Sequence, residues 1–370
     1  MVAPKRLDSI DILKCIAILM ILTVHQGQMF KHCSLYELSK IGQLGCQCFF
    51  VISGFTLCQS WESRKQTVGN FYKRRLRAIA PGYYFDIILF TIISSIIAYS
   101  NIPRYWHQGE SLFPGLSHLE NILFLHGLSP QSINSIVPGG WYIGTTMLMY
   151  LSFPLMKKML DVVKPYKSGI IILPTVFTII AIGFWYAVMS FSEKTLIGNN
   201  SFAYFFVLTQ YPCFLWGGVL YSYSSTYGSP RTVQSISTCI FLACVSLCAT
   251  VLLFYSDNDM LFVLVPVSAA IFFGCIMLLM IRLIDDKGYR LPRIVLTVCK
   301  KISGVSYEMY LIHTLFAYFI VYYLRKILKH FDYSYIFDYS FVFIIFLFGL
   351  IVFSYYCGKI LKHYLNKLTR

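Results

Sequence analysis

The chain of 370 residues is 57% hydrophobic and only 13% charged, a balance far from the one typical of soluble domains. This composition excludes a water-soluble globular enzyme. The formal charge of +15 does not indicate nucleic-acid binding, because Lys and Arg fall mostly in alternate short loops between apolar runs.

Apolar runs of about 20 residues, the length that crosses a bilayer, recur along the whole chain. Backbone groups cannot stay unpaired in hydrocarbon, and these runs lack the strict alternation of a barrel strand, so they predict helices. We expect an all-α bundle of about ten transmembrane helices. The predicted spans cover residues 9–26, 41–60, 80–100, 141–156, 169–190, 202–223, 234–255, 260–284, 302–323 and 337–357.

An even number of spans places both termini on one side of the membrane. The basic segments at Lys5 and Arg6, at 64–77 and at 359–370 then share that side, which the positive-inside rule makes the cytoplasm. We expect residues 1–370 to form a single multi-pass domain surrounded by membrane lipid, with no appended soluble domain.

Ionisable side chains are costly inside a span, so each is a candidate site residue. The first span carries Asp11, Lys14 and His25. Asp11 and Lys14 are three residues apart and can pair on one helix face, and Lys14 and His25 lie about three turns apart, roughly 16 Å along the axis. The imidazole of His25 can serve as a general base at neutral pH. The alternative is an interfacial histidine bonded to a backbone carbonyl.

The second span contains the run from Phe49 to Phe55, with Ser53 and Gly54 at its centre. Small residues at such positions let two helices approach closely in a membrane. We interpret this run as a helix-packing motif.

A basic cluster follows at the cytoplasmic boundary, where Lys73, Arg74, Arg75 and Arg77 fall within five residues. Guanidinium groups match phosphate oxygens bidentately, so the cluster predicts a site for a phosphorylated cofactor. The alternative is an anchor to anionic lipid headgroups.

The longest predicted loop outside the cytoplasm runs over 101–140 and carries several histidines, among them His118 and His126. Loops of this length in a compact bundle are usually functional or folded onto it. A cap over the helices and a substrate-contacting segment are both consistent with the sequence.

Aromatic and ionisable residues mark two later spans. Trp141 and Tyr142 open one of them and Tyr150 follows, as in an interfacial aromatic belt. Near the C-terminus Glu308 and His313 place another acid and another imidazole in a span. The twelve cysteines lie mainly in apolar segments and indicate neither a disulfide framework nor a metal site.

In order and spacing these features resemble the acyltransferase-3 family of integral-membrane O-acyltransferases, which modify bacterial cell-surface sugars. The resemblance spans nearly the whole chain. The matching features are Ile10 to Lys14 followed by His25, the run from Phe49 to Phe55, Arg74 and Arg77 with Pro81, the segment from Trp141 to Pro154, and Ser306 through His313.

The resemblance implies a ten-helix core in the bacterial plasma (inner) membrane that moves an acyl group from cytoplasmic acyl-CoA to a hydroxyl of a surface polysaccharide or lipid-linked glycan. Acetyl-CoA is the expected donor, with succinyl-CoA next, and neither a metal nor nucleic acid is expected. A homo-oligomer is compatible with the sequence. On this hypothesis His25 is the general base, the donor is bound by Lys14, Arg74, Arg75 and Arg77, and the acceptor is bound by Trp141, Tyr142, Tyr150, Glu308 and His313.

Two departures from the family pattern matter. Lys14 stands where the family has arginine and lacks the guanidinium fork. Thr146 stands where members usually carry glutamate, so either another acid such as Glu308 compensates or the chemistry differs. A carrier or flippase for a lipid-linked sugar, and an inactive member acting as a scaffold, are the alternative functions.

Overall fold

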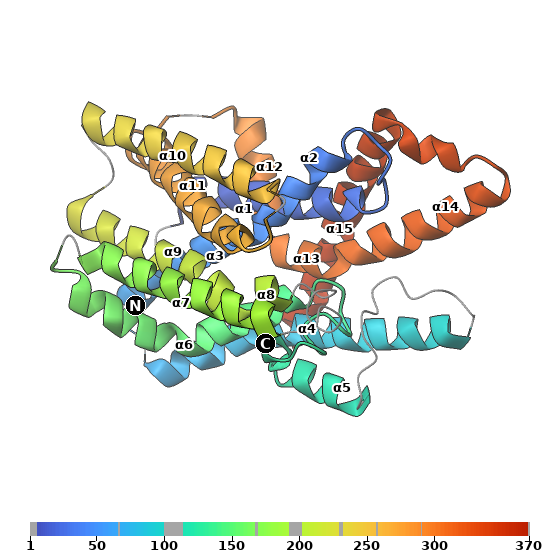
Figure 1. Cartoon of the computed structure of the whole chain (residues 1–370), viewed down its shortest axis with the longest axis horizontal. Helices are drawn as coiled ribbons and strands as arrows, with labels where there is room; N and C mark the ends of the chain where they lie inside the picture. The colour runs from blue at the N-terminus through green and yellow to red at the C-terminus, as the bar shows by residue number, and fades with distance from the viewer. Residues whose placement is uncertain are drawn as a thin grey trace. The chain divides into compact units, whose positions relative to one another are not determined.

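A computed structural model describes residues 6–65, 67–99, 114–166, 169–191, 202–228, 232–256, 258–289 and 291–368 (Figure 1). Throughout these residues the chain is all-α, as hydropathy predicts, and they contain no β-strand. Nine helical segments in the described ranges are long and apolar enough to cross a membrane. The side of the membrane on which the termini lie stays a prediction.

Each of the ten predicted spans falls on a helix. The segment predicted at 141–156 forms α6 (Trp141–Val163), but α6 is not among the nine candidate spans. Threonine, serine and two adjacent lysines lower its mean hydropathy. The described part of the chain therefore has nine candidate spans rather than ten.

The chain folds as two compact units. The first comprises Met1–Ile10, Gln47–Leu76 and Trp106–Leu291, and the second comprises Asp11–Cys46, Arg77–Tyr105 and Pro292–Arg370. Helix α4 (Val68–Tyr99) contributes its first turns to the first unit and the remainder to the second.

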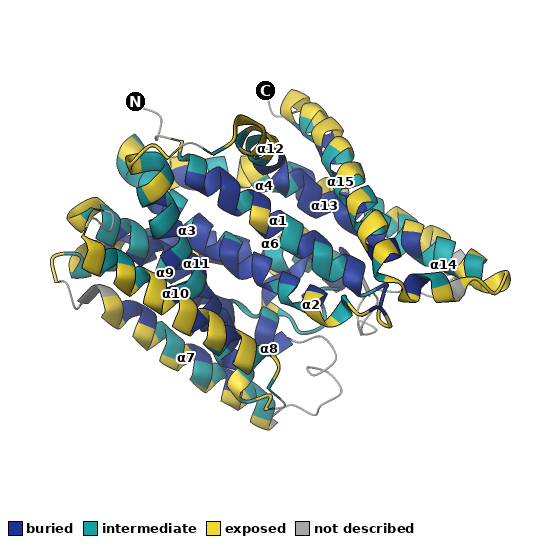
Figure 2. Ribbon diagram, turned by 90° about the horizontal axis from the view of Figure 1, so that it is seen from above, coloured by how far each residue is buried: buried dark blue, intermediate teal, exposed yellow. Residues whose placement is uncertain are grey.

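In the first unit, α9 is the central helix and packs against α6, α7 and α11. The candidate span Phe202–Tyr227, which contains α9, is 67% buried in its most apolar stretch, against 17% for α10. Helix α10 is therefore largely exposed, as Figure 2 shows, and presents an apolar surface to lipid. Besides α6 and the first turns of α4, the elements of this unit are α3 (Gly45–Arg64), α5 (Pro114–Ile122), η2 (His126–Leu128), α7 (Gly169–Phe191), α8 (Phe202–Phe205), α9 (Val207–Tyr227), α10 (Val233–Phe254), η3 (Leu261–Val263), α11 (Leu264–Met280) and η4 (Ile281–Asp286).

Helices α3 and α9 touch backbone to backbone at two glycines. A β-carbon on Gly54 would lie 1.9 Å from the carbonyl oxygen of Phe214, and one on Gly217 would lie 2.0 Å from that of Val51. Only glycine fits at either position. The packing role predicted for the Ser-Gly run is confirmed.

In the second unit, α1 and α13 run parallel. Ser303 donates to the carboxylate of Asp11 near one end, and the rings of His25 and His313 meet near the other. Helix α15 packs along α13. The elements of this unit are α1 (Asp8–Gly27), α2 (Tyr36–Lys40), η1 (Ile41–Leu44), α12 (Arg293–Ser303), α13 (Ser306–Thr314), η5 (Leu315–Ile320), α14 (Val321–His330), η6 (Ser334–Asp338) and α15 (Ser340–Leu368).

Candidate active site

A chain of hydrogen bonds fixes the protonation of His25, which is half-buried near the end of α1. Nδ1 of His25 lies 2.7 Å from the hydroxyl of Tyr318, and that hydroxyl donates its only proton to Oε1 of Gln28. The hydroxyl must therefore accept from Nδ1. Neutral His25 carries its proton on Nδ1 and its lone pair on Nε2, the atom that can accept a proton from a substrate.

His313, on α13, forms a second imidazole beside the first. Its Nδ1 donates to the carbonyl oxygen of Tyr310 at 2.5 Å, so its lone pair is also on Nε2. That Nε2 is buried and has no hydrogen-bond partner among the described residues. The ring centroids of His25 and His313 are 4.8 Å apart. The structure thus brings together the two histidines that the sequence singled out separately.

Tyr318 and Gln28 are site residues that sequence reasoning missed. Tyr318 lies in η5, a π-helical segment directly after α13, and π-helical turns often occur at functional sites. The wider turn changes the direction of the side chains that follow His313. No periodicity in the sequence marks this change, and the only available signal was a polar hydroxyl inside an apolar span.

Glu308 lies on the side of α13 that faces α15, where its carboxylate is 3.9 Å from the ammonium group of Lys362. Lys362 also donates to the carbonyl oxygen of Gly304. Glu308 is therefore held in a pair with Lys362. Lys14 lies on α1 about three turns before His25, as the helical spacing predicts.

The basic segment of α4 forms an arginine cluster in the first unit. Arg74 lies close enough to Arg64 and Arg75 for their positive charges to act on it. The guanidinium of Arg75 also rests over the rings of Phe71 and Tyr150, at 6.0 and 5.9 Å. No carboxylate among the described residues pairs with Arg64, Arg74 or Arg75.

An excess of positive charge without acid partners is suited to a polyanion. Tyr150, predicted as an acceptor ligand, packs against this cluster. Arg77 follows about one turn after Arg74 on α4 and its side chain is exposed.

Trp141 and Tyr142 belong to an aromatic group at the start of α6. Trp141 stacks on Phe205 with ring centroids 4.5 Å apart, and Tyr142 packs on Phe50 at 4.9 Å. Trp141 is buried, so its indole serves packing, whereas Tyr142 is only partly buried.

Thr146 is buried, and its hydroxyl has no hydrogen-bond partner in the described part of the chain. Gln47 on α3 donates to Tyr204 and Gln210, at 2.9 and 2.8 Å, inside the same unit. The position of the family glutamate is thus occupied here by a short, uncharged side chain in a core that also contains an amide network.

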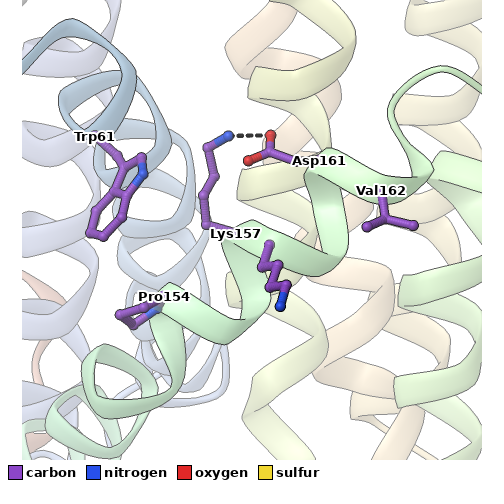
Figure 3. A pocket seen from close by; sticks show the side chains of 6 residues that line it. Trp61, Pro154, Lys157, Asp161 and Val162 are labelled. Carbon is purple, nitrogen blue, oxygen red and sulfur yellow. Dashed lines mark hydrogen bonds and ion pairs between the residues drawn. The ribbon is translucent and has the colours of Figure 1, made fainter. Parts of the chain in front are cut away.

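A pocket of about 330 Å³ opens near the end of α6, beside a buried lysine (Figure 3). Lys157 pairs with Asp161 and, at 3.1 Å, with Glu62, which also accepts from Tyr221 at 2.8 Å. These ion pairs neutralise the lysine in place. The pocket is lined by Trp61, Pro154, Lys157, Lys158, Asp161 and Val162.

His126 is fully buried in η2, and its Nε2 donates to the carbonyl oxygen of Gly140 at 3.1 Å. Its ring also lies against Gly144, where a β-carbon would come within 2.6 Å of Nε2. This part of the predicted loop packs as a cap over α6. Residues 101–113 of the same loop lie outside the described residues.

In the described ranges, apolar spans surround buried histidines and polar groups that have no hydrogen-bond partner there, which is the pattern of a multi-pass membrane protein with a polar interior. The family model described as "Acyltransferase domain", of the acyltransferase-3 type, matches residues 7–359. The chain belongs to this family and is a membrane acyltransferase.

Two curated proteins are similar to parts of the chain. One is "Acyltransferase MdmB" of Streptomyces mycarofaciens, 27% identical over 161 residues, which covers 40% of this chain and 39% of that protein. The other is "Regulator of hypoxia-inducible factor 1" of Caenorhabditis elegans, 27% identical over 201 residues, covering 48% and 38%. The matched segments thus cover about two fifths of each relative. No solved structure matches the chain.

Proposed function

We propose that this membrane acyltransferase moves an acyl group from cytoplasmic acyl-CoA to a hydroxyl of an extracytoplasmic cell-surface glycan, in the plasma (inner) membrane of a bacterium. Acetyl is the first donor group to test and succinyl the second. On this proposal residues 1–370 act as one transmembrane acyltransferase domain. The acyltransferase named in Streptomyces supports a transferase rather than a carrier.

The hydrogen-bond chain from His25 through Tyr318 to Gln28 carries the proposal. It leaves the lone pair of His25 on Nε2, as a general base requires. In the proposed step, Nε2 takes the proton of the acceptor hydroxyl, and the hydroxyl oxygen attacks the acyl carbon. The new C–O bond forms as the C–S bond breaks, and the thiolate leaves and takes up a proton as CoA. His313 stands beside His25 and is available to share the added proton.

The unpaired arginine cluster supports the choice of donor. CoA carries several phosphate charges, and Arg74 and Arg75 offer guanidinium forks for which no acid among the described residues competes. Arg77 and Lys14 add cationic charge for the same donor on this proposal. Trp141, Tyr142, Tyr150, Glu308 and His313 stay proposed acceptor contacts, with Tyr150 supported least because it packs on Arg75.

The test is transfer of label from acyl-CoA by the purified chain in lipid vesicles. Labelled acetyl-CoA and a glycan extract are supplied on opposite sides, and the product is identified by mass. Acetyl ester on the glycan is the expected result, and replacing Arg74 and Arg75 by Gln should raise the KM for acetyl-CoA roughly tenfold or more. Movement of unmodified glycan without ester would instead identify a carrier.

A lipid anchor predicts a different result for the same arginine variant. If Arg74 and Arg75 only bind headgroups, the KM for acetyl-CoA should not change in vesicles of neutral lipid. Lys65→Gln, a nearby exposed cation at the end of α3, is the matched control and should leave the donor KM as it is.

A further inference from the structure

Asp86 is a buried carboxylate that the mechanism above does not use. It lies on the part of α4 that belongs to the second unit, inside a candidate membrane span, and its exposed fraction is 0%. Neither carboxylate oxygen has a hydrogen-bond partner among the described residues. A carboxyl group in an apolar bundle is costly unless donors satisfy it, so the position calls for a ligand that supplies them.

The packing of α4 on α13 shows where Asp86 lies. Gly82 rests against the side chains of Tyr307 and Leu311, and the Tyr307 hydroxyl donates to the carbonyl oxygen of Ile79 at 2.7 Å. The two helices therefore run in the same direction along this stretch. Asp86 follows Gly82 by one turn, and the next turn of α13 after Leu311 carries His313 and Thr314.

This turn of α13 also carries unpartnered polar atoms. Thr314 and His313 are both 0% exposed, and neither Oγ1 of Thr314 nor Nε2 of His313 has a hydrogen-bond partner in the described ranges. His313 in turn lies beside His25. In the second unit, the carboxyl group of Asp86, the hydroxyl of Thr314 and the lone pairs of two imidazoles therefore lie at a similar height along the helices.

These groups match a ligand that presents several hydroxyl groups. A carboxyl group can hydrogen-bond two hydroxyls, by accepting at its oxygens and, when protonated, by donating as well, and threonine both donates and accepts. An apolar ligand would leave all of these atoms unsatisfied. We infer that Asp86 is a specificity residue that binds a second hydroxyl of the acceptor, next to the hydroxyl that loses its proton to His25. This inference rests on the proposed function and names its acceptor class as vicinal diols.

A pair of small acceptors tests the inference. The full chain in vesicles is given labelled acetyl-CoA with either trans-1,2-cyclohexanediol or cyclohexanol, which differ by one hydroxyl. The unaltered protein should prefer the diol. Asp86→Leu should lower the diol-to-alcohol ratio of kcat/KM by ~10- to 100-fold. Asp86→Asn, which keeps one acceptor oxygen, should give an intermediate ratio.

Ser95→Ala is the matched control on the same helix, because Ser95 is exposed and bonds only within α4. It should leave the ratio unchanged. An unchanged ratio in Asp86→Leu, or an equal fall of both rates, would overturn the assignment of Asp86 while leaving acyl transfer intact as the function. Transfer to the glycan extract but to neither small acceptor would overturn the assignment of vicinal diols as the acceptor class. No transfer to the glycan extract or to either small acceptor would overturn the proposed function itself, and this inference with it.

Discussion

His25 and Tyr318 are joined edge to face, with Nδ1 of the imidazole 2.7 Å from the phenolic oxygen and the ring planes at 90°. Because the Tyr318 proton goes to Gln28, this contact sets the tautomer of His25. The contact connects the end of α1 to the π-helical segment η5, and the two residues are 293 positions apart along the chain.

Replacing Tyr318 by Phe should lower kcat by roughly 10- to 100-fold with little change in either KM, because His25 would then adopt both tautomers and lose its fixed orientation. Steady-state acyl transfer in vesicles measures both constants. Tyr323→Phe, on the following helix, should be silent. A rise in KM alone would mean that Tyr318 holds substrate rather than the base.

The two lysines that pair with Glu62 should differ in importance. Lys157 is 4% exposed and 3.1 Å from Glu62, whereas Lys164 is 27% exposed and 3.5 Å away. Lys157→Met should cost about 1–3 kcal/mol of stability, because Glu62 and Asp161 lose a buried partner, and Lys164→Met less than about 1 kcal/mol. Thermal unfolding in detergent tests the order. Equal losses would show that burial does not strengthen the pair.

Gly54→Ala should be strongly destabilising. Its new methyl group would lie 1.9 Å from the backbone oxygen of Phe214, which cannot rotate away, so α3 and α9 must separate. We expect a loss of about 2–4 kcal/mol. Gly69→Ala on α4 is the control, because nothing lies within 4 Å of its added carbon. A normal melting temperature for Gly54→Ala would disprove the close contact.

The positions of the helices follow directly from the sequence, whereas the candidate site follows only in part. Apolar length alone located the helices that contain His25 and His313, because lipid permits little else. That the two imidazoles meet depends on the parallel packing of α1 and α13, which no local pattern encodes. Tyr318 was missed because the π-helical turn changes its direction. Asp86 was missed although it obeys the same rule that singled out Asp11, a charge inside a predicted span.

His126 should make the stability of the protein depend on pH. Burial lowers the pKa of His126 to about 4, below the value of about 6.5 for the unfolded chain, so the folded state binds fewer protons between these values. The stability it contributes is complete above the unfolded pKa and is lost as the pH falls toward the folded one.

Thermal unfolding across this range is the measurement. The melting temperature should fall from neutral pH toward pH 4, and His126→Gln, which can still donate to Gly140, should flatten that fall. A pH profile that is the same with and without His126 would place the titrating group elsewhere.

Acyl transfer by His25→Gln tests the central claim most directly, because glutamine keeps a polar side chain of similar length but cannot take up a proton at neutral pH. Label from acetyl-CoA is followed onto the glycan in vesicles, with thermal unfolding as the check on folding. We predict a fall in kcat of roughly 100- to 10,000-fold at an unchanged melting temperature. Transfer at the unaltered rate would contradict the assignment of His25 as the base.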